Sequence, residues 1–250
     1  MSEKSEKERN VGRLKKLLSD FSPRDILLLE SADRQFVALE NLFRSLRNPE
    51  LFFKLTLINA LLSYQLSMKG EVYWERFSEF FSQSTGGFEE FIRRYNKRFL
   101  SAKLKRLRKA AFCVESLFET FPFQELGKDL KLLVDFLSAC MGQDRGAKTI
   151  VFASKMFCYA YRIVTGRTPE GIEGITIPYD SRLSKIATKD EWQNLSRELG
   201  IPPIKLDSLV WIPMGMSREE IKKKLPEPLA GKVLNLKKEL EKLRKERGSR

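Results

Sequence analysis

The sequence contains no histidine, and this absence excludes several kinds of active site. Without an imidazole there is no Ser-His-Asp triad, no Cys-His nucleophilic pair and no His-ligated metal. The three cysteines, Cys113, Cys140 and Cys158, are far apart and cannot supply the four thiolates of a zinc or iron–sulfur site. We therefore expect none of these metal sites. We also expect the cysteines to be small buried residues in a reducing compartment.

Long apolar runs are missing as well. Every apolar stretch is interrupted by Lys, Arg or Ser before it reaches the length of a membrane span, and the first ten residues are polar and charged. These features predict a soluble protein of the cytoplasm with no membrane partner.

Acidic residues are too few to balance the basic ones. Lys and Arg number 46 against 33 Asp and Glu, which gives a formal net charge of +13. Such a balance favours a polyanionic partner, because neutralised phosphates release their condensed counterions. The alternative is a highly charged surface of the kind found in thermophile proteins. A length of 250 residues with 42% hydrophobic content allows one large domain or two closely packed subdomains.

Apolar residues recur with helical spacing along the chain, and no segment alternates as a strand does, so the sequence predicts an all-α protein. The segment 49–62 is apolar on nearly all sides and is predicted to be a central buried helix. The basic run 97–109 is either a solvated helix face or a phosphate contact. No flexible linker separates independent domains, so we treat residues 1–250 as a single helical unit.

Residues 130–165 predict two helices joined by a short hairpin. Gly142 and Gly146 flank the turn, where glycine permits left-handed backbone and close approach of a ligand. The second helix would direct its first backbone N–H groups to the same place, which suits a DNA phosphate. By itself this pattern is weak, since many helical proteins turn on two glycines.

Lys148 is placed at the start of that second helix. The positive end of the helix dipole disfavours an ammonium there, and the charge of Arg145 acts in the same direction. The position therefore suits a neutral amine nucleophile. The alternative is a surface lysine that happens to follow a turn.

Asp180 stands just before another predicted helix, where a carboxylate accepts backbone N–H bonds. A purely structural cap is the commoner role for a single aspartate. The same bonds would also orient a carboxylate in an active site.

Together these residues resemble a known superfamily. The hairpin ending in Gly146-Ala147-Lys148, followed by an aspartate before a helix, is similar to the helix-hairpin-helix DNA glycosylases. The 32-residue separation of Lys148 and Asp180 resembles the archaeal 8-oxoguanine DNA glycosylases (AGOG), as do the runs 148–156 and 63–71. The likeness extends from about Ser31 to Trp211, although the hairpin departs from the usual Leu-Pro-Gly-Val-Gly form.

This resemblance implies two helical subdomains with the active site in the cleft between them, and it implies roles for further residues. Phe152, Trp74 and Trp211 match aromatic residues of a pocket for a flipped base, where the alternative is ordinary core packing. Asp207, four residues before Trp211, and Gln35 match polar residues of the same pocket. Gln65 resembles a glutamine that related enzymes insert into the duplex.

The reaction implied is that of a bifunctional DNA glycosylase and AP lyase, which requires no metal or organic cofactor. Lys148 attacks the sugar C1′ while Asp180 assists, and a Schiff base leads to β-elimination. The expected partner is double-stranded DNA, with single-stranded DNA as a further substrate, containing 8-oxoguanine, and the expected state is a monomer. Two alternatives stay open: a glycosylase for another damaged base, and a non-enzymatic helical nucleic-acid-binding module.

Overall fold

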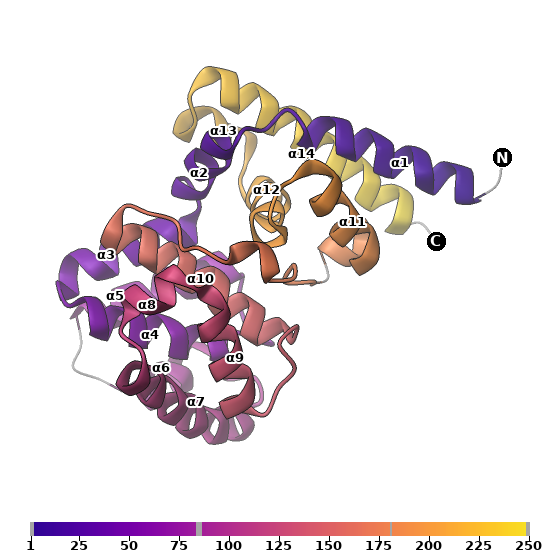
Figure 1. Ribbon diagram of the computed structural model, residues 1–250. Coiled ribbons are helices and arrows are strands. Elements are labelled where there is room, and N and C mark those ends of the chain that lie inside the picture. The colour runs from indigo at the N-terminus through magenta and orange to yellow at the C-terminus, as the bar shows by residue number, and fades with distance from the viewer. Residues whose placement is uncertain (1–2, 84–86, 181, 249–250) are drawn as a thin grey trace. The chain divides into compact units, whose positions relative to one another are not determined.

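The computed structural model describes residues 3–83, 87–180 and 182–248, and throughout these ranges the regular elements are helices (Figure 1). The chain divides into two compact units. One unit comprises Arg34–Pro178, and the other comprises Met1–Asp33 with Tyr179–Arg250. The prediction of an all-α protein is confirmed.

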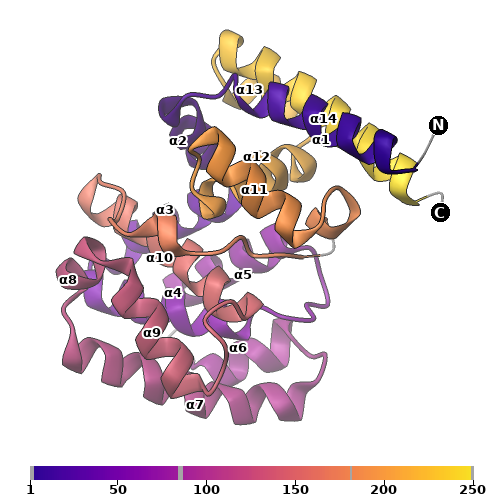
Figure 2. The same ribbon diagram turned by 45° about the vertical axis from the view of Figure 1, so that its right-hand side comes forward.

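The unit Arg34–Pro178 is a layered bundle of helices. It contains α3 (Arg34–Leu46), α4 (Pro49–Leu62), α5 (Gly70–Gln83), α6 (Phe88–Tyr95), α7 (Leu100–Thr120), α8 (Phe123–Lys128), α9 (Leu130–Met141), α10 (Lys148–Thr165) and the 3₁₀ turn η1 (Ile172–Gly174). Helix α4 packs against α10, α7 and α3, and α7 lies beside α9 (Figure 2).

Helix α4 is the central element of this unit, as its composition predicted. Asn48 caps it by accepting a hydrogen bond from the Leu51 N–H, and Pro49 occupies its first turn. Nine of its fourteen residues are buried, from Phe52 to Leu62. Because α4 is enclosed on several sides, its neighbours α7 and α10 are held in a fixed relation to one another.

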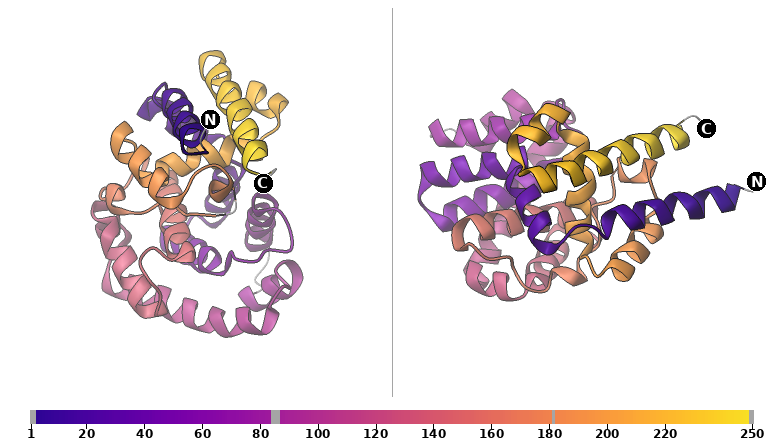
Figure 3. Two further views of the ribbon diagram at one scale, coloured as in Figure 1. Left: turned by 90° about the vertical axis from the view of Figure 1, so that its right-hand side faces the viewer. Right: turned by 90° about the horizontal axis from the view of Figure 1, so that it is seen from above.

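The second unit is assembled from both ends of the chain. It contains α1 (Glu3–Leu18), α2 (Pro23–Ser31), the 3₁₀ turn η2 (Leu183–Lys185), α11 (Lys189–Leu199), α12 (Pro203–Gly215), α13 (Arg218–Lys224) and α14 (Glu227–Gly248). Helices α1 and α14 run side by side in opposite directions, as the two termini at one end of both helices show (Figure 3). Arg13 of α1 pairs with Glu239 of α14 at 3.1 Å.

A buried ion pair fixes α2 to α12 in this unit. Lys205 Nζ lies 2.7 Å from Glu30 Oε2, and the Ser208 hydroxyl donates to Glu30 Oε1 at 2.9 Å. Both carboxylate oxygens of Glu30 therefore have partners, which offsets the cost of removing this charge from water. Helix α12 also carries Asp207 and Trp211, so the pair helps to fix two residues singled out by the sequence.

The expectation of three free cysteines is wrong for two of them. Cys113 of α7 and Cys140 of α9 form a disulfide, with their Cα atoms 5.8 Å apart, while Cys158 is free and buried as expected. A spacing of 27 residues gives no hint that two helices lie side by side. The disulfide joins α7 to the last turn of α9, directly before the hairpin.

Candidate active site

The hairpin between α9 and α10 begins with a glycine in left-handed conformation. Gly142 has φ of 62°, and its N–H donates to the Ala139 and Ser138 carbonyls. The Gln143 N–H also donates to the Ser138 carbonyl, at 2.9 Å. These bonds end α9 in the manner typical of a glycine cap. Gly146 has no positive φ, so the predicted left-handed backbone is present only at Gly142.

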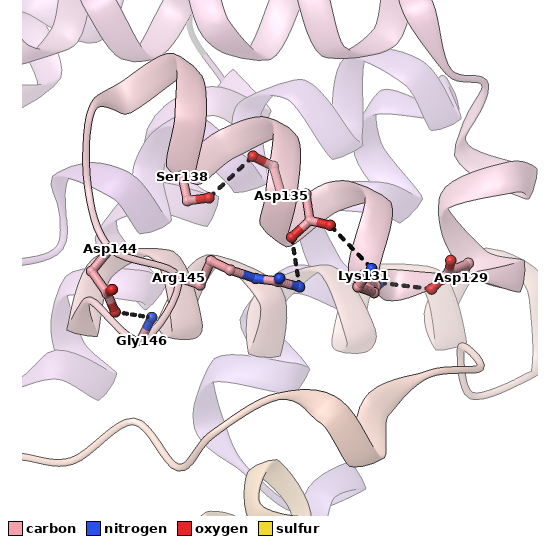
Figure 4. A network of polar contacts seen from close by, with 7 residues as sticks. All are labelled: Asp129, Lys131, Asp135, Ser138, Asp144, Arg145 and Gly146. Carbon is pink, nitrogen blue, oxygen red and sulfur yellow. Dashed lines mark hydrogen bonds and ion pairs between the residues drawn. The ribbon is translucent and has the colours of Figure 1, made fainter.

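The two charged residues of the hairpin are each engaged within it or with α9 (Figure 4). Asp144 Oδ1 accepts the Gly146 N–H at 2.7 Å, so this hairpin amide already has an acceptor within the protein. Arg145 pairs with Asp135 of α9 at 2.6 Å. Asp135 also pairs with Lys131 at 3.6 Å and is therefore shared by two cations, and the effect of the Arg145 charge on Lys148 stays a prediction.

Lys148 is the first residue of α10, and its side chain is exposed. In the described ranges it forms no ion pair with a carboxylate. Ala147, which precedes it, provides no side-chain cap, so the first N–H groups of α10 receive no side-chain acceptor from that position. An unpaired amine at a helix N-terminus is available to attack an electrophile.

Two aromatic side chains lie on the side of α10 that carries Lys148. Phe152 follows the lysine by four residues, which places both on one helix face. Its ring meets Trp74 of α5 edge to face, with centroids 6.0 Å apart and an interplanar angle of 69°. Trp74 is fully buried, and among the described residues its indole N–H has no hydrogen-bond acceptor. A buried donor of this kind is costly and suits an acceptor on a ligand.

Gln35 and Lys155 are also buried in this unit. Gln35 on α3 is 1% exposed and is therefore not a solvated helix residue. Lys155 is 3% exposed and follows Lys148 by seven residues and Phe152 by three, with its ammonium 5.8 Å from the Tyr159 ring centroid. Lys155 was not among the predicted site residues, although the 148, 152, 155 spacing is that of one helix face.

Gln65 lies in the loop between α4 and α5 and is exposed. Its φ is 46°, a left-handed conformation that is unfavourable for a residue with a side chain. The Lys103 ammonium donates to the Gln65 carbonyl at 3.3 Å, and the same ammonium lies 5.1 Å from the Tyr64 ring centroid. The backbone at Gln65 is thus held from α7.

Lys103 corrects the prediction for the basic run, because it is fully buried and not part of a solvated face. It also donates to the Asn96 side-chain oxygen, and the Asn96 amide donates in turn to the Leu62 carbonyl at 3.1 Å. Burial, with a contribution from the nearby Arg98 charge, lowers the pKa of Lys103 to about 8. Helical spacing along α7 turns Lys103 inward, while Lys105 stays exposed.

Arg106, one turn after Lys103, joins two segments that the sequence keeps far apart. Its Nε donates to the Leu61 carbonyl at 2.9 Å, at the end of α4. Its Nη2 donates to Gln143 Oε1 at 2.6 Å and to Thr149 Oγ1 at 2.9 Å. The guanidinium also lies 5.6 Å from the Tyr64 ring centroid, and burial lowers its pKa. Arg106 therefore ties the Gln65 loop to the hairpin and to the residue after Lys148.

Asp180 belongs to the other unit and accepts two backbone hydrogen bonds. Its Oδ1 receives the Arg182 N–H at 2.8 Å and the Leu183 N–H at 3.1 Å. The element that follows is the short 3₁₀ turn η2, not the α-helix that the sequence predicted. Both bonds end on Oδ1, so they orient the carboxylate without involving Oδ2.

Arg182 connects this turn to Trp211 of α12. Its guanidinium lies 3.5 Å from the Trp211 ring centroid and donates to the Trp211 carbonyl at 3.4 Å. Arg182 thereby covers one face of the indole, a cation–π contact that sequence reasoning missed. Asp207, one turn earlier on α12, is 4% exposed. This unit therefore brings Asp180 and Trp211 together through Arg182.

The described residues contain neither a metal-binding cluster nor a membrane-spanning helix. No group of three or more His, Cys, Asp or Glu side chains that could hold a metal ion occurs among the described residues. None of the helices described has both the length and the apolar character needed to cross a membrane.

Comparison with known proteins finds relatives that share one name, N-glycosylase/DNA lyase. A family model for N-glycosylase/DNA lyases, AGOG, matches residues 15–245. The chain is 35% identical to the N-glycosylase/DNA lyase of Methanococcus maripaludis over 227 residues, which cover 83% of this chain and 90% of the relative. It is 38% identical to that of Nanoarchaeum equitans over 198 residues, which cover 78% and 87%.

A solved structure resembles the fold. This is the 8-oxoguanosine complex of Pa-AGOG, an 8-oxoguanine DNA glycosylase from Pyrobaculum aerophilum. It matches with a TM-score of 0.76 at 27% identity, covering 90% of this chain and 96% of the other.

The helical fold and these relatives define the class first, which is that of the DNA glycosylases with AP lyase activity. Within that class the chain belongs to the AGOG family of N-glycosylase/DNA lyases. The resemblance stated from the sequence is confirmed. The alternative of a non-enzymatic binding module is set aside.

Proposed function

We propose that this chain excises 8-oxoguanine from DNA and then cleaves the strand, with Lys148 as the nucleophile. The observation that carries the proposal is the set of residues around Lys148. An amine without a carboxylate partner begins α10, Phe152 follows on the same face, and Phe152 contacts a buried Trp74 whose N–H has no acceptor among the described residues. The 8-oxoguanosine bound to the Pyrobaculum aerophilum relative supports the choice of base.

The aromatic pair suits a flat purine taken out of the base stack. A flipped base needs a surface to stack on and polar groups at its edges. Phe152, which is partly exposed, offers a ring face, and Trp74 offers a donor for an acceptor atom on the base. Gln35, buried on α3, adds an amide with one donor group and one acceptor. An 8-oxopurine carries both a carbonyl at C8 and an N–H at N7, which suits paired donors and acceptors.

The reaction proceeds by substitution at the sugar. The neutral amine of Lys148 attacks C1′, and the C1′–N9 bond breaks with its electron pair leaving on the base, which takes up a proton. The lysine nitrogen loses a proton and the sugar ring opens, which gives a Schiff base between Nζ and C1′. Loss of a C2′ proton then expels the 3′ phosphate by β-elimination.

Asp180 is proposed to assist this step as a fixed carboxylate. Two backbone N–H groups hold its Oδ1 and therefore orient the side chain. A carboxylate in this state stabilises positive charge that develops on the sugar and accepts the proton from the attacking amine. Trp211, Asp207 and Gln65 are proposed to contact the base or the duplex, and Gly142 and Gly146 the DNA backbone.

The substrate is proposed to be duplex DNA, with single-stranded DNA as a second substrate, and the enzyme to act as a monomer. A substrate of this kind places its action with the chromosome. Size-exclusion chromatography with light scattering of the free enzyme and of its complex with a lesion duplex tests the monomer. A dimer at working concentration would overturn it.

Excision from oligonucleotides that each carry one defined lesion tests the choice of base. The expected order is efficient release of 8-oxoguanine and weak release of oxidised pyrimidines or mismatched bases. Equal or faster release of another damaged base would replace 8-oxoguanine as the substrate. In the same assay Asp180→Asn is expected to slow excision by about 100-fold or more, and wild-type turnover would remove Asp180 from the mechanism.

A further inference from the structure

The outward side of the first half of α7 and the turn directly before it carry positive charge that the protein does not neutralise. Arg98, Lys105, Arg108 and Lys109 are exposed, and within the described ranges none of them pairs with a carboxylate. Several other cations of the same unit are paired with carboxylates, although Arg44 and Lys128 are not among the described residues that form such pairs. Lys54, Arg34, Arg76, Arg93, Lys131 and Arg145 all form ion pairs.

The two ends of this basic strip lie beside the two segments proposed to contact DNA. At one end, the Arg98 charge acts on Lys103, whose ammonium holds the Gln65 carbonyl. At the other end, the Lys109 ammonium lies 3.4 Å from where a Cβ on Gly142 would be, which places it against the start of the hairpin. The strip therefore runs along α7 from the Gln65 loop to the hairpin.

The spacing along the helix fits a run of phosphates. Lys105 and Lys109 are four residues apart, so their side chains share one face of α7. From Leu100 to Lys109 the helix rises about 13.5 Å, a length over which one strand of B-DNA carries about four phosphates. Exposed ammonium groups at this spacing reach successive phosphates without any change in the backbone.

The hairpin itself has little positive charge to offer. The Gly146 N–H is bonded to the Asp144 carboxylate, and Arg145 is paired with Asp135. The Asp144 carboxylate repels a phosphate, and cations from a neighbouring element offset that repulsion. Lys109 is the exposed cation placed against Gly142.

We propose that Arg98, Lys105 and Lys109 form a phosphate-binding strip along which one strand of the DNA passes between the Gln65 loop and the hairpin. This surface extends the DNA contact beyond the hairpin, and it rests on the proposed DNA contacts of Gln65 and of the hairpin. The inward side of the same helix, through Lys103 and Arg106, holds both of these segments, so the strip and the two contacts form one rigid surface.

The salt dependence of DNA binding tests the strip. Lys105→Gln and Lys109→Gln are combined, and affinity for an undamaged duplex is measured by fluorescence anisotropy at 0.05–0.3 M salt. The slope of log affinity against log salt is expected to fall by about 0.9 for each phosphate contact, or about 1.8 in total. If the whole effect is counterion release, affinity at 0.1 M salt falls about 60-fold and the two proteins converge near 1 M.

A matched control separates the strip from general charge. Arg44→Gln and Lys128→Gln also remove two exposed cations of the same unit that have no carboxylate partner among the described residues. This control is expected to keep the wild-type slope. A Lys105/Lys109 variant whose slope matches the control would overturn the proposal and make the strip a solvated helix face.

Failure of the strip and failure of the proposed function give different results. At low salt with enzyme in excess, the Lys105/Lys109 variant is expected to excise 8-oxoguanine completely, because neither residue takes part in the chemistry. If the wild-type enzyme does not excise 8-oxoguanine, the proposed function fails, while the comparison of salt slopes stays valid. Circular dichroism of the variant is expected to match wild type, since both side chains are exposed.

Discussion

Replacing Arg106 by methionine should loosen two distant segments at once. The substitution keeps an unbranched, apolar side chain but removes the hydrogen bonds to Leu61, Gln143 and Thr149. Each hydrogen bond from a charged donor contributes about 1.5–3 kcal/mol. The contributions are not additive, because desolvation of the guanidinium opposes them. We expect the free energy of unfolding to fall by about 2–4 kcal/mol in urea denaturation.

The location of the effect is more informative than its size. Amide hydrogen exchange is expected to accelerate roughly tenfold or more in the hairpin, which corresponds to about 1.4 kcal/mol of local opening. The reporting amides are those of Gln143, Ala147 and Val151. The amides of Ser63 and Tyr64, at the end of α4, are expected to accelerate with them. Single-turnover excision should slow in parallel, because Thr149 directly follows Lys148.

The control for this variant is Arg44→Met, which removes an exposed arginine of α3 with no carboxylate partner among the described residues. It is expected to leave stability and exchange unchanged. Acceleration in only one of the two segments would refute the reasoning. So would equal acceleration in the control, because Arg106 would then not couple the Gln65 loop to the hairpin.

Three further predictions concern other contacts. Replacing both Cys113 and Cys140 by serine opens a loop of 27 residues, and chain entropy predicts that the free energy of unfolding falls by roughly 3–4 kcal/mol. A variant as stable as wild type, together with a wild type whose stability does not change on adding reductant, would contradict this. The pKa of Lys103 is lowered from 10.5 to about 8, so the unfolded state binds more protons than the folded state between these pH values. The free energy of unfolding should therefore rise with pH from about 8 to 10. A Lys103→Met variant should lack this rise, and an identical pH profile in both proteins would refute the assignment. Arg182→Met removes the contact on Trp211 and should raise KM for 8-oxoguanine duplexes, with little change in the cleavage of a preformed abasic site. An equal loss of activity on both substrates would contradict a role confined to the base.

The sequence predicted the helices and the hairpin because these depend on local spacing. The segments 130–141 and 148–165 are helices, and the apolar segment 49–62 is the buried centre of its unit. Such features follow from periodicity and from the helix ends at Asn48 and Gly142. The family could also be predicted from the sequence, because its motifs are the short runs 63–71 and 148–156 and the separation of Lys148 and Asp180.

The contacts between helices were not within reach. Lys103 and Lys105 look alike in sequence, yet one is fully buried and the other is exposed, because 100° per residue turns them to different sides of α7. The partners of Arg145 and Arg106 lie on other elements, and the Cys113–Cys140 disulfide depends on how α7 packs beside α9. Asp180 was predicted to accept backbone N–H bonds, and it does, but the turn that follows is too short to show as a periodic pattern.

The central claim is that Lys148 forms the covalent bond to the sugar. Borohydride reduction during the reaction with a duplex that contains one 8-oxoguanine, followed by peptide mapping of the trapped complex, tests it most directly. The account predicts a trapped complex whose modified peptide carries the adduct on Lys148, and no trapped complex with Lys148→Gln. An adduct on another residue, or undiminished trapping by Lys148→Gln, would contradict it.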